Sequence, residues 1–316
     1  MNGEAYMNRQ MTLLISASFL ILTLVLLASV VTVAVRRPVI VNPQAASEER
    51  FVGTQDVSRV GPSSTSMLTT LSIKNDRLRQ IRDPVVSPGE LSVTVPTLMY
   101  HYVRPITPEM TTSSRWLSVS PEHFRAQMEE LVRLGYHTIT PDDLADAVTG
   151  QKILPTKPVL ITFDDGYRDQ YTKAFPILKT HGLRATFFII SDYHLNPLYL
   201  TNDQIRELDQ SGLITIAAHT RHHVGLADRQ SDKQKDEIGG SKQDLEQVVG
   251  HPITAFAYPY GNFNAAVKRL VAEAGFRTGF STILGSIHTS SSLFEARRIR
   301  VLDDEYLEPI LKKFSR

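Results

Sequence analysis

Cysteine is absent from the 316 residues of this chain. Its absence excludes disulfide bonds and thiolate metal ligands, so any metal site has to use other side chains. An excess of charge of one sign is also lacking, since the formal net charge is +1, and no electrostatic argument favours a nucleic-acid partner or an acidic surface. Hydrophobic residues make up 42% of the chain, which is enough for one full-sized domain with additional segments.

Charged residues are missing from one long stretch near the N-terminus. Residues 11–35 contain none, and most of them are Leu, Ile, Val, Ala or Phe. A helix of this length covers the roughly 30 Å of a bilayer's hydrocarbon core, whereas the apolar part of a secretory signal has only about 7–15 residues. We therefore expect residues 1–36 to form a cytoplasmic tip and an uncleaved, single-pass transmembrane anchor. Cleavage after Ala34 is the alternative.

The charges beside this stretch weakly indicate an orientation opposite to the one that we expect. Arg9 precedes it, whereas Arg36 and Arg37 follow it, which favours a cytoplasmic C-terminal side. We nevertheless expect the following domain to lie outside the cytoplasm, at the cell membrane, because of the motifs that this domain carries. Residues 37–92 are polar and carry several prolines and glycines, so we expect a linker or stalk there.

From residue 93 to residue 316, short apolar runs alternate with segments of helical spacing. One helix has clear limits, since Ser120 and Pro121 suit its start and Gly135 suits its end. A strand followed by a helix, repeated about seven times, predicts an α/β domain whose parallel sheet can close into a barrel. The expected strands are 97–103, 159–163, 185–190, 214–219, 255–258, 278–281 and 298–301. The expected helices are 121–134, 141–148, 171–181, 202–210, 232–249 and 264–274.

The most informative feature of this domain is a pair of adjacent carboxylates at the end of an apolar run. Asp164 and Asp165 follow Pro158-Val159-Leu160-Ile161-Thr162-Phe163. Like charges this close repel one another, and each is costly to desolvate, so a bound cation is a common reason for such a pair. A solvated Asp-Asp-Gly turn is the alternative interpretation of this segment taken alone.

A histidine pair follows a second apolar run. His219 and His223 come after residues 213–218, and their imidazoles converge on one ion if the segment makes a helical turn. With one carboxylate they supply two nitrogen ligands and one oxygen ligand, a set that suits zinc or a neighbouring divalent metal and leaves a position open. His222, between them, then points away from the ion into solvent.

Four segments together resemble the polysaccharide deacetylases, the NodB-like carbohydrate esterases. They are 162–167 (Thr-Phe-Asp-Asp-Gly-Tyr), 219–223 (His-Thr-Arg-His-His), 258–261 (Tyr-Pro-Tyr-Gly) and 98–103 (Leu-Met-Tyr-His-Tyr-Val). The resemblance covers roughly residues 95–302 and is greatest for the subgroup that acts on the poly-N-acetylglucosamine of biofilms. It implies a distorted (β/α) barrel of about seven strands, with the site residues at the C-terminal ends of those strands.

The resemblance also assigns roles to the two motifs. Asp165, His219 and His223 are the expected metal ligands. Asp164 is the expected base, because in this family the first Asp is the base and the second is the ligand. Zinc is the expected metal, with cobalt or nickel as alternatives.

The third motif departs from the usual pattern of the family. Tyr260 matches the position whose backbone amide binds the oxyanion, and Pro259 and Gly261 shape its turn. The arginine that usually precedes this turn and orients the base is Ala257 here. Arg298, in the late strand, is the expected replacement. Its neighbours are the alternatives: Arg297 and Arg300.

The acid that protonates the leaving amine has more than one candidate. Many family members carry a histidine after the late strand, but residues 302–316 contain none. By resemblance to the biofilm subgroup, His101 is the expected acid, and a structural, hydrogen-bonded role is its alternative. The other contender is His288, which we expect in a surface loop.

The sequence therefore predicts a hydrolase that removes N-acetyl groups from an N-acetylglucosamine polysaccharide. Poly-N-acetylglucosamine is favoured over peptidoglycan and chitin as the substrate, and no nucleic-acid partner is expected. A catalytically inactive, membrane-anchored glycan-binding or scaffold module on the same fold is the alternative. Ala257 favours this alternative, whereas the intact base and metal motifs oppose it.

Overall fold

The computed structural model of the protein describes residues 84–315. The anchor expected at residues 11–35 and most of the expected linker lie outside this range. Within residues 84–315, no helix combines the length and the apolar character that a bilayer crossing requires.

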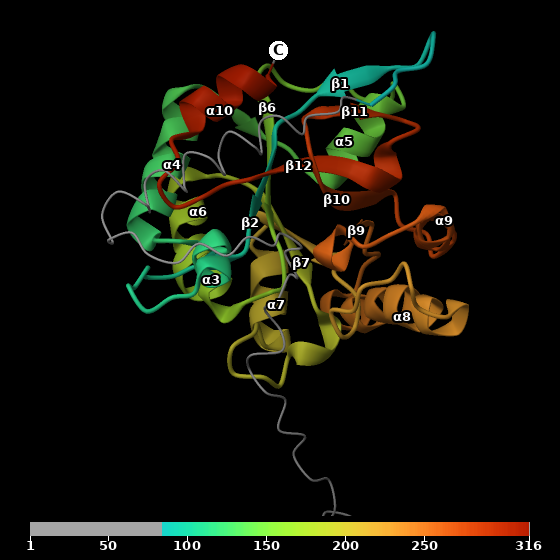
Figure 1. The fold of residues 1–316 in the computed structure, drawn as a ribbon. Coiled ribbons are helices and arrows are strands. Elements are labelled where there is room, and N and C mark those ends of the chain that lie inside the picture. The colour runs from blue at the N-terminus through green and yellow to red at the C-terminus, as the bar shows by residue number, and fades with distance from the viewer. Residues whose placement is uncertain (1–83, 316) are drawn as a thin grey trace, which may run out of the picture. The chain divides into compact units, whose positions relative to one another are not determined.

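A closed ring of parallel strands forms the centre of the domain (Figure 1). Its strands are β2 (Thr97–Tyr100), β6 (Pro158–Phe163), β7 (Ala185–Ile189), β8 (Ile214–Ala218), β9 (Ala255–Ala257), β10 (Thr278–Leu284) and β12 (Ala296–Arg300). They are bonded in the order β2-β12-β10-β9-β8-β7-β6, and β2 also pairs with β6, which closes the barrel. The short strand β5 (His137–Thr138) extends the sheet beyond β6. The predicted α/β barrel of parallel strands is thus confirmed.

Helices surround this barrel, and Figure 1 shows α4 and α6 on one side of it and α8 and α9 on the other. The helices are α3 (Thr112–Trp116), α4 (Pro121–Arg133), α5 (Pro141–Val148), α6 (Phe175–His181), α7 (Asn202–Gln210), α8 (Ser231–Val249), α9 (Ala265–Glu273) and α10 (Leu307–Phe314). Several begin where the sequence supplies a cap. Ser120 accepts a hydrogen bond from the His123 amide at the start of α4, and Thr140 and Asp143 form a capping box at α5.

Alternation along the strands decides which side chains enter the barrel. On β6, Ile161 and Phe163 belong to the large outer core beneath the helices, whereas Leu160 belongs to the inner core. Successive side chains of a strand point to opposite faces, so Thr162 and then Asp164 continue the inward series. On β12 the outward-facing Ile299 leaves Arg298 on the inner face.

Two expected elements differ from the structure, and one helix was missed. The expected strand 97–103 is interrupted at His101, and its second part is β3 (Tyr102–Val103), which pairs with β4 (Ser118–Val119). The expected helix 171–181 begins instead with a π-helical turn, Gln170–Ala174. The C-terminal helix α10 was not expected at all.

The expectation for His288 was also wrong, because this residue is not in a surface loop. It lies in β11 (Ile287–Thr289), which pairs with β1 (Ser92–Thr94), and its side chain is fully buried. Burial lowers the pKa of His288 to about 4, and its Nε2 lies 3.1 Å from the carbonyl oxygen of Val95. Because Val95 precedes β2, this histidine lies near the N-terminal end of the barrel, opposite the strand ends that carry the acidic pair.

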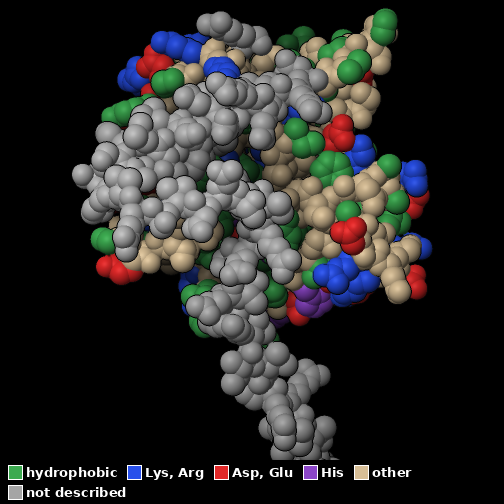
Figure 2. All heavy atoms as spheres, viewed as in Figure 1, with side chains coloured by type: hydrophobic (Ala, Val, Ile, Leu, Met, Phe, Trp, Pro, Cys, Tyr) green, Lys and Arg blue, Asp and Glu red, His purple; other side chains and the backbone are tan. Residues whose placement is uncertain are grey.

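The surface of the domain reflects its balanced composition. On the face drawn in Figure 2, Lys and Arg side chains lie next to Asp and Glu side chains in the part that the structure describes. This mixture agrees with the formal net charge of +1.

Candidate active site

The two adjacent aspartates point in different directions. Asp164 extends β6 and faces the barrel interior, whereas Asp165 has a left-handed backbone with φ of 75°. That conformation is uncommon for a residue other than glycine, and it turns the Asp165 side chain toward the end of β8. Both carboxylates are buried. The backbone at Asp165 therefore separates two like charges that the sequence places side by side.

A buried arginine neutralises Asp164. Arg298 donates from both terminal nitrogens to the two carboxylate oxygens, at 2.6 and 2.8 Å. The guanidinium also donates through Nε to the Ser281 carbonyl and through a terminal nitrogen to the Thr162 hydroxyl. This two-pronged geometry is the strong form of an arginine–carboxylate pair. Of the three candidate arginines, Arg298 is the one that the structure places against Asp164.

The electrostatics of Asp164 favour its charged form. Burial alone would raise the pKa of this carboxyl, but the charge of Arg298, with smaller contributions from His219 and His101, holds the pKa below its ordinary value of 3.8. Asp164 is therefore ionised at neutral pH, as a base must be.

A metal-ligand set lies directly beside this pair. Asp165, His219 and His223 each present one ligand atom, and these atoms lie within 4.8 Å of one another. Nε2 of His219 and Nε2 of His223 are 3.3 and 3.1 Å from Oδ1 of Asp165.

The chemistry of these donors fits a divalent cation. His219 Nδ1 is 2.8 Å from the carbonyl oxygen of Ala257, which can only accept, so Nδ1 carries the proton and Nε2 presents a lone pair. Oδ1 of Asp165 is buried and receives no hydrogen bond from any residue that the structure describes. Burial alone would raise the pKa of Asp165, but the charge of His223 and hydrogen bonds from both histidines, when their rings are protonated, hold it well below its ordinary value. A bound metal would supply the positive charge in the same place.

The segment between the two histidines is not the helical turn that we expected. Thr220 and His223 both have left-handed backbones, with φ of 64° and 54°, and the His223 amide donates to the Thr220 hydroxyl at 2.9 Å. This tight loop, rather than a helix, brings the two imidazoles together. His222 does point away from the ligand atoms, but it is not simply solvated, because both of its ring nitrogens face carboxylates.

His101 lies at the break between β2 and β3. Its side chain is largely buried, and its Nε2 is 3.9 Å from Oδ2 of Asp164. The structure therefore brings the expected acid next to the expected base.

Gln170 is a site residue that the sequence did not reveal. It is fully buried at the start of the π-helical turn, and its Nε2 donates to the carbonyl of His101 at 3.0 Å and to that of Asp164 at 2.6 Å. π-Helical turns are rare and often occur at functional sites. This amide ties together the backbones that carry the expected acid and base.

The turn after β9 borders the metal-ligand set. Tyr260 has φ of 60°, its side chain is 38% exposed, and its ring centroid is 4.6 Å from that of His223. Pro259 is buried, and a Cβ atom at Gly261 would overlap the Thr282 hydroxyl. Tyr258 instead packs inside the domain and donates its hydroxyl to the Phe294 carbonyl. The turn thus places Tyr260 at the open side of the site.

A tyrosine cluster forms another border that the sequence did not reveal. The rings of Tyr102 and Tyr167 stack at 3.6 Å, and Tyr199 lies 5.1 Å from Tyr167 and 4.8 Å from Tyr193. Burial, with the nearby charge of Asp165, raises the pKa of Tyr102 to about 12. Tyr167 and Tyr199 are buried, and the Arg104 guanidinium lies 3.5 Å over the Tyr102 ring, so these rings pack against one another beside the site. Tyr102 and Tyr167 belong to the motif segments 98–103 and 162–167, whereas Tyr193 and Tyr199 lie in a part of the sequence where we recognised no motif.

Comparisons with known proteins agree with this site. A family model described as polysaccharide deacetylase matches residues 151–279. The Bacillus subtilis protein YxkH is 32% identical over 212 residues, which cover 67% of this chain and 73% of that protein. The poly-beta-1,6-N-acetyl-D-glucosamine N-deacetylase of Escherichia coli K12 is 24% identical over 64% of this chain, but the match spans only 35% of its own length.

A solved structure supports the same relationship. The Streptococcus pyogenes deacetylase PplD, solved in complex with acetate, superposes with a TM-score of 0.65 at 28% identity. The match covers 71% of this chain and 99% of that one. The chain belongs to the polysaccharide deacetylase family and is a hydrolase of carbon–nitrogen bonds other than peptide bonds.

Proposed function

We propose that this protein removes N-acetyl groups from an N-acetylglucosamine polysaccharide, with poly-N-acetylglucosamine as its preferred substrate. The observation that carries the proposal is the Asp164–Arg298 pair directly beside the Asp165–His219–His223 set. A glycan-binding module needs no ionised, oriented base next to a cation site. This arrangement therefore favours catalysis over the inactive alternative.

Each protein group has one task in the hydrolysis. A divalent metal held by Asp165, His219 and His223, most simply zinc, would polarise the substrate carbonyl and acidify a water molecule. Asp164 takes a proton from the attacking water molecule while the water oxygen adds to the acetyl carbon. The backbone amide of Tyr260 donates to the oxygen that becomes negative.

His101 completes the reaction at the leaving group. It transfers a proton to the nitrogen as the carbon–nitrogen bond breaks, so the products are acetate and a free amine. Its place beside Asp164, directly after the strand that pairs with β6, supports this role.

The choice of polymer rests on two features of this chain. The expected acid directly follows the first barrel strand, and the base-orienting arginine lies on the last. This is the pattern of the biofilm subgroup that the sequence resembles. The named substrate of the E. coli relative is consistent with this choice. The uncharged residues 11–35 support a further part of the proposal, that the enzyme is anchored in the membrane with its catalytic domain outside the cytoplasm.

Acetate release from a panel of polymers tests the proposal. Purified protein, supplied with zinc, cobalt or nickel, is incubated separately with oligomers of poly-N-acetylglucosamine, peptidoglycan and chitin. We expect release from all three to be metal-dependent and fastest from poly-N-acetylglucosamine. Faster release from peptidoglycan or chitin would overturn the substrate assignment, and no release with any metal would favour the glycan-binding module.

A further inference from the structure

The loop that carries the two histidine ligands needs an external support. Residues 219–223 follow β8 without a helix or strand of their own, and two of them adopt left-handed conformations that non-glycine residues disfavour. A hydrogen bond from the His223 amide to the Thr220 side chain closes the loop, and the carbonyls of Thr220 and Arg221 accept from the amides of Ser191 and Asp192. None of these bonds uses the amides of Arg221 and His222.

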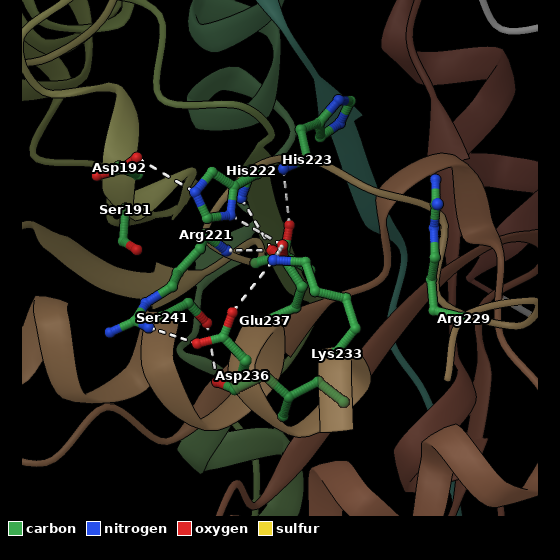
Figure 3. A network of polar contacts seen from close by, with 12 residues as sticks. Ser191, Asp192, Arg221, His222, His223, Arg229, Lys233, Asp236, Glu237 and Ser241 are labelled. Atoms are coloured by element: carbon green, nitrogen blue, oxygen red, sulfur yellow. Dashed lines mark hydrogen bonds and ion pairs between the residues drawn. The ribbon is translucent and has the colours of Figure 1, made fainter. Parts of the chain in front are cut away.

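Glu237, on helix α8, supplies that support (Figure 3). Its Oε2 accepts from the backbone amides of both Arg221 and His222, each at 2.9 Å. Its Oε1 faces Nδ1 of His222 and Nζ of Lys233, each at 2.8 Å. One carboxylate thus binds the two central amides of the loop and the side chain between the ligands.

The direction of the neighbouring imidazoles follows from this contact. Figure 3 shows His222 directed toward Asp192 and Glu237, whereas His223 is directed away from them. Nε2 of His222 is 3.2 Å from Oδ2 of Asp192, so both sides of the ring are held. His222 is thus fixed on one side of the loop, and the His223 side chain lies on the other, with the ligand set.

The burial of Glu237 shows how specific this arrangement is. The residue has no exposed surface, and a carboxylate is rarely buried unless donors surround it. Helix α8 also leaves room for the loop at Gly240, because a Cβ atom there would overlap the Arg221 guanidinium. That guanidinium pairs with Asp236 and Asp244, one on each side of Gly240.

We propose that Glu237 is a positioning residue for the metal site, which fixes the loop between His219 and His223 so that both imidazoles reach one ion. The inference rests on the proposed metal-dependent function, because it assumes that these histidines bind the metal. The contacts of Glu237 are with Arg221, His222 and Lys233 and not with the ligand atoms of Asp165, His219 and His223. Its loss should therefore weaken metal binding and leave the chemistry intact once metal is bound.

Titration of the metal-free protein with zinc, followed by calorimetry, tests the inference without any substrate. We expect Glu237→Gln to raise the zinc dissociation constant by about 10–100-fold, as for other groups that orient metal ligands. The matched control is Glu246→Gln, on the same helix. Glu246 also pairs with a lysine four residues earlier and accepts from a backbone amide, that of Ile253, far from the loop. We expect it to bind zinc within about twofold of wild type, since it does not touch the loop.

Two further measurements keep the result unambiguous. If Glu237→Gln does not fold, Glu237→Asp retains the charge but withdraws the carboxylate, and it should weaken zinc binding to an intermediate extent. At saturating zinc, turnover of either folded variant should return to within about threefold of wild type, which separates positioning from catalysis. Wild-type affinity in folded Glu237 variants, or equal weakening by Glu246→Gln, would overturn the inference. Failure of the proposed function would show separately, as absent acetate release with normal zinc affinities.

Discussion

The base and the metal ligands lie side by side but are held in different ways. Asp164 is fixed by a side chain from another strand, inside the closed barrel, through a charged pair with Arg298. The histidine loop is fixed through its backbone amides by Glu237, from a helix outside the barrel. The comparison shows that Arg298 controls the charge state of the base, whereas Glu237 controls the backbone conformation of the histidine loop. Substitutions in the two halves should therefore affect different measurements.

The largest expected effect tests whether the two halves separate. Asp164→Asn preserves the size of the side chain but removes the base, so turnover should fall by about 10³-fold or more. Zinc affinity, measured by calorimetry, should stay within a few-fold of wild type because Asp165 and both histidines are intact. A parallel loss of zinc binding would show that the two aspartates act as one unit.

Removal of the expected acid should have the next largest effect. His101→Ala should reduce turnover by about 10²-fold, because proton donation to the leaving amine is lost. A substrate whose leaving group needs no proton should be cleaved by the variant at nearly the wild-type rate. Acetate release from an activated aryl acetate measures this rate. An unchanged rate on the polysaccharide would assign the proton donor to solvent, since His288 is buried near the other end of the barrel.

Loss of the charged pair should change the pH dependence. Arg298 lowers the pKa of Asp164 against the opposing effect of burial, so Arg298→Met should raise that pKa and protonate the base at higher pH. The acid limb of kcat/KM should therefore move to higher pH, with a fall of about tenfold or more at neutral pH. Removing one partner of a buried ion pair also costs about 3–5 kcal/mol of stability. That loss should lessen as the pH falls through the raised pKa of Asp164 in the folded variant, because protonation removes the unpaired buried charge.

A matched arginine provides the control for this prediction. Arg277 also contacts two carboxylate groups, those of Asp142 and Asp146, but it is partly exposed and distant from the base. Arg277→Met should leave the acid limb of kcat/KM in place. A shift of equal size in both variants would point to a general loss of stability.

The smallest effect concerns the bridge between the two expected proton-transfer residues. Gln170→Met keeps the approximate size of the side chain and removes its two donated hydrogen bonds, which should lower kcat by about tenfold. Gln127→Met is the control, because Gln127 is also buried and donates to two backbone carbonyls, those of Leu302 and Glu305. We expect both variants to lower Tm and only the first to lower kcat. Equal values of kcat would assign Gln170 a structural role.

Much of the barrel could be predicted because strand and helix periodicities are local. The apolar runs before Asp164 and His219 mark two strand ends, and parallel strands bring such ends to one edge. The inward-facing residues of β12 were harder to predict. Three of its five residues are arginines, and the sequence does not show which arginine is buried. The structure resolves this through Ile299, whose outward packing leaves Arg298 inside.

The supporting residues could not be predicted, since their burial depends on tertiary packing. Glu237 and Gln170 look like ordinary polar positions of helices, and nothing nearby in sequence marks them as buried. The loop after His219 was expected to be helical from ligand spacing alone, which does not specify backbone conformation. His288 lies among glycine and serine residues that suggest a loop, whereas its burial comes from a strand almost 200 residues earlier in the chain.

Barrel closure has a consequence for the order in which this enzyme becomes active during synthesis. Asp164 and Arg298 are 134 residues apart, and they meet only when β12 takes its place beside β2. A growing chain that ends before residue 298 holds a carboxylate that cannot be buried in its charged form. Asp164 therefore becomes a buried, ionised base only when the last barrel strand is in place. Partly synthesised or C-terminally truncated chains should be inactive even when every metal ligand is present.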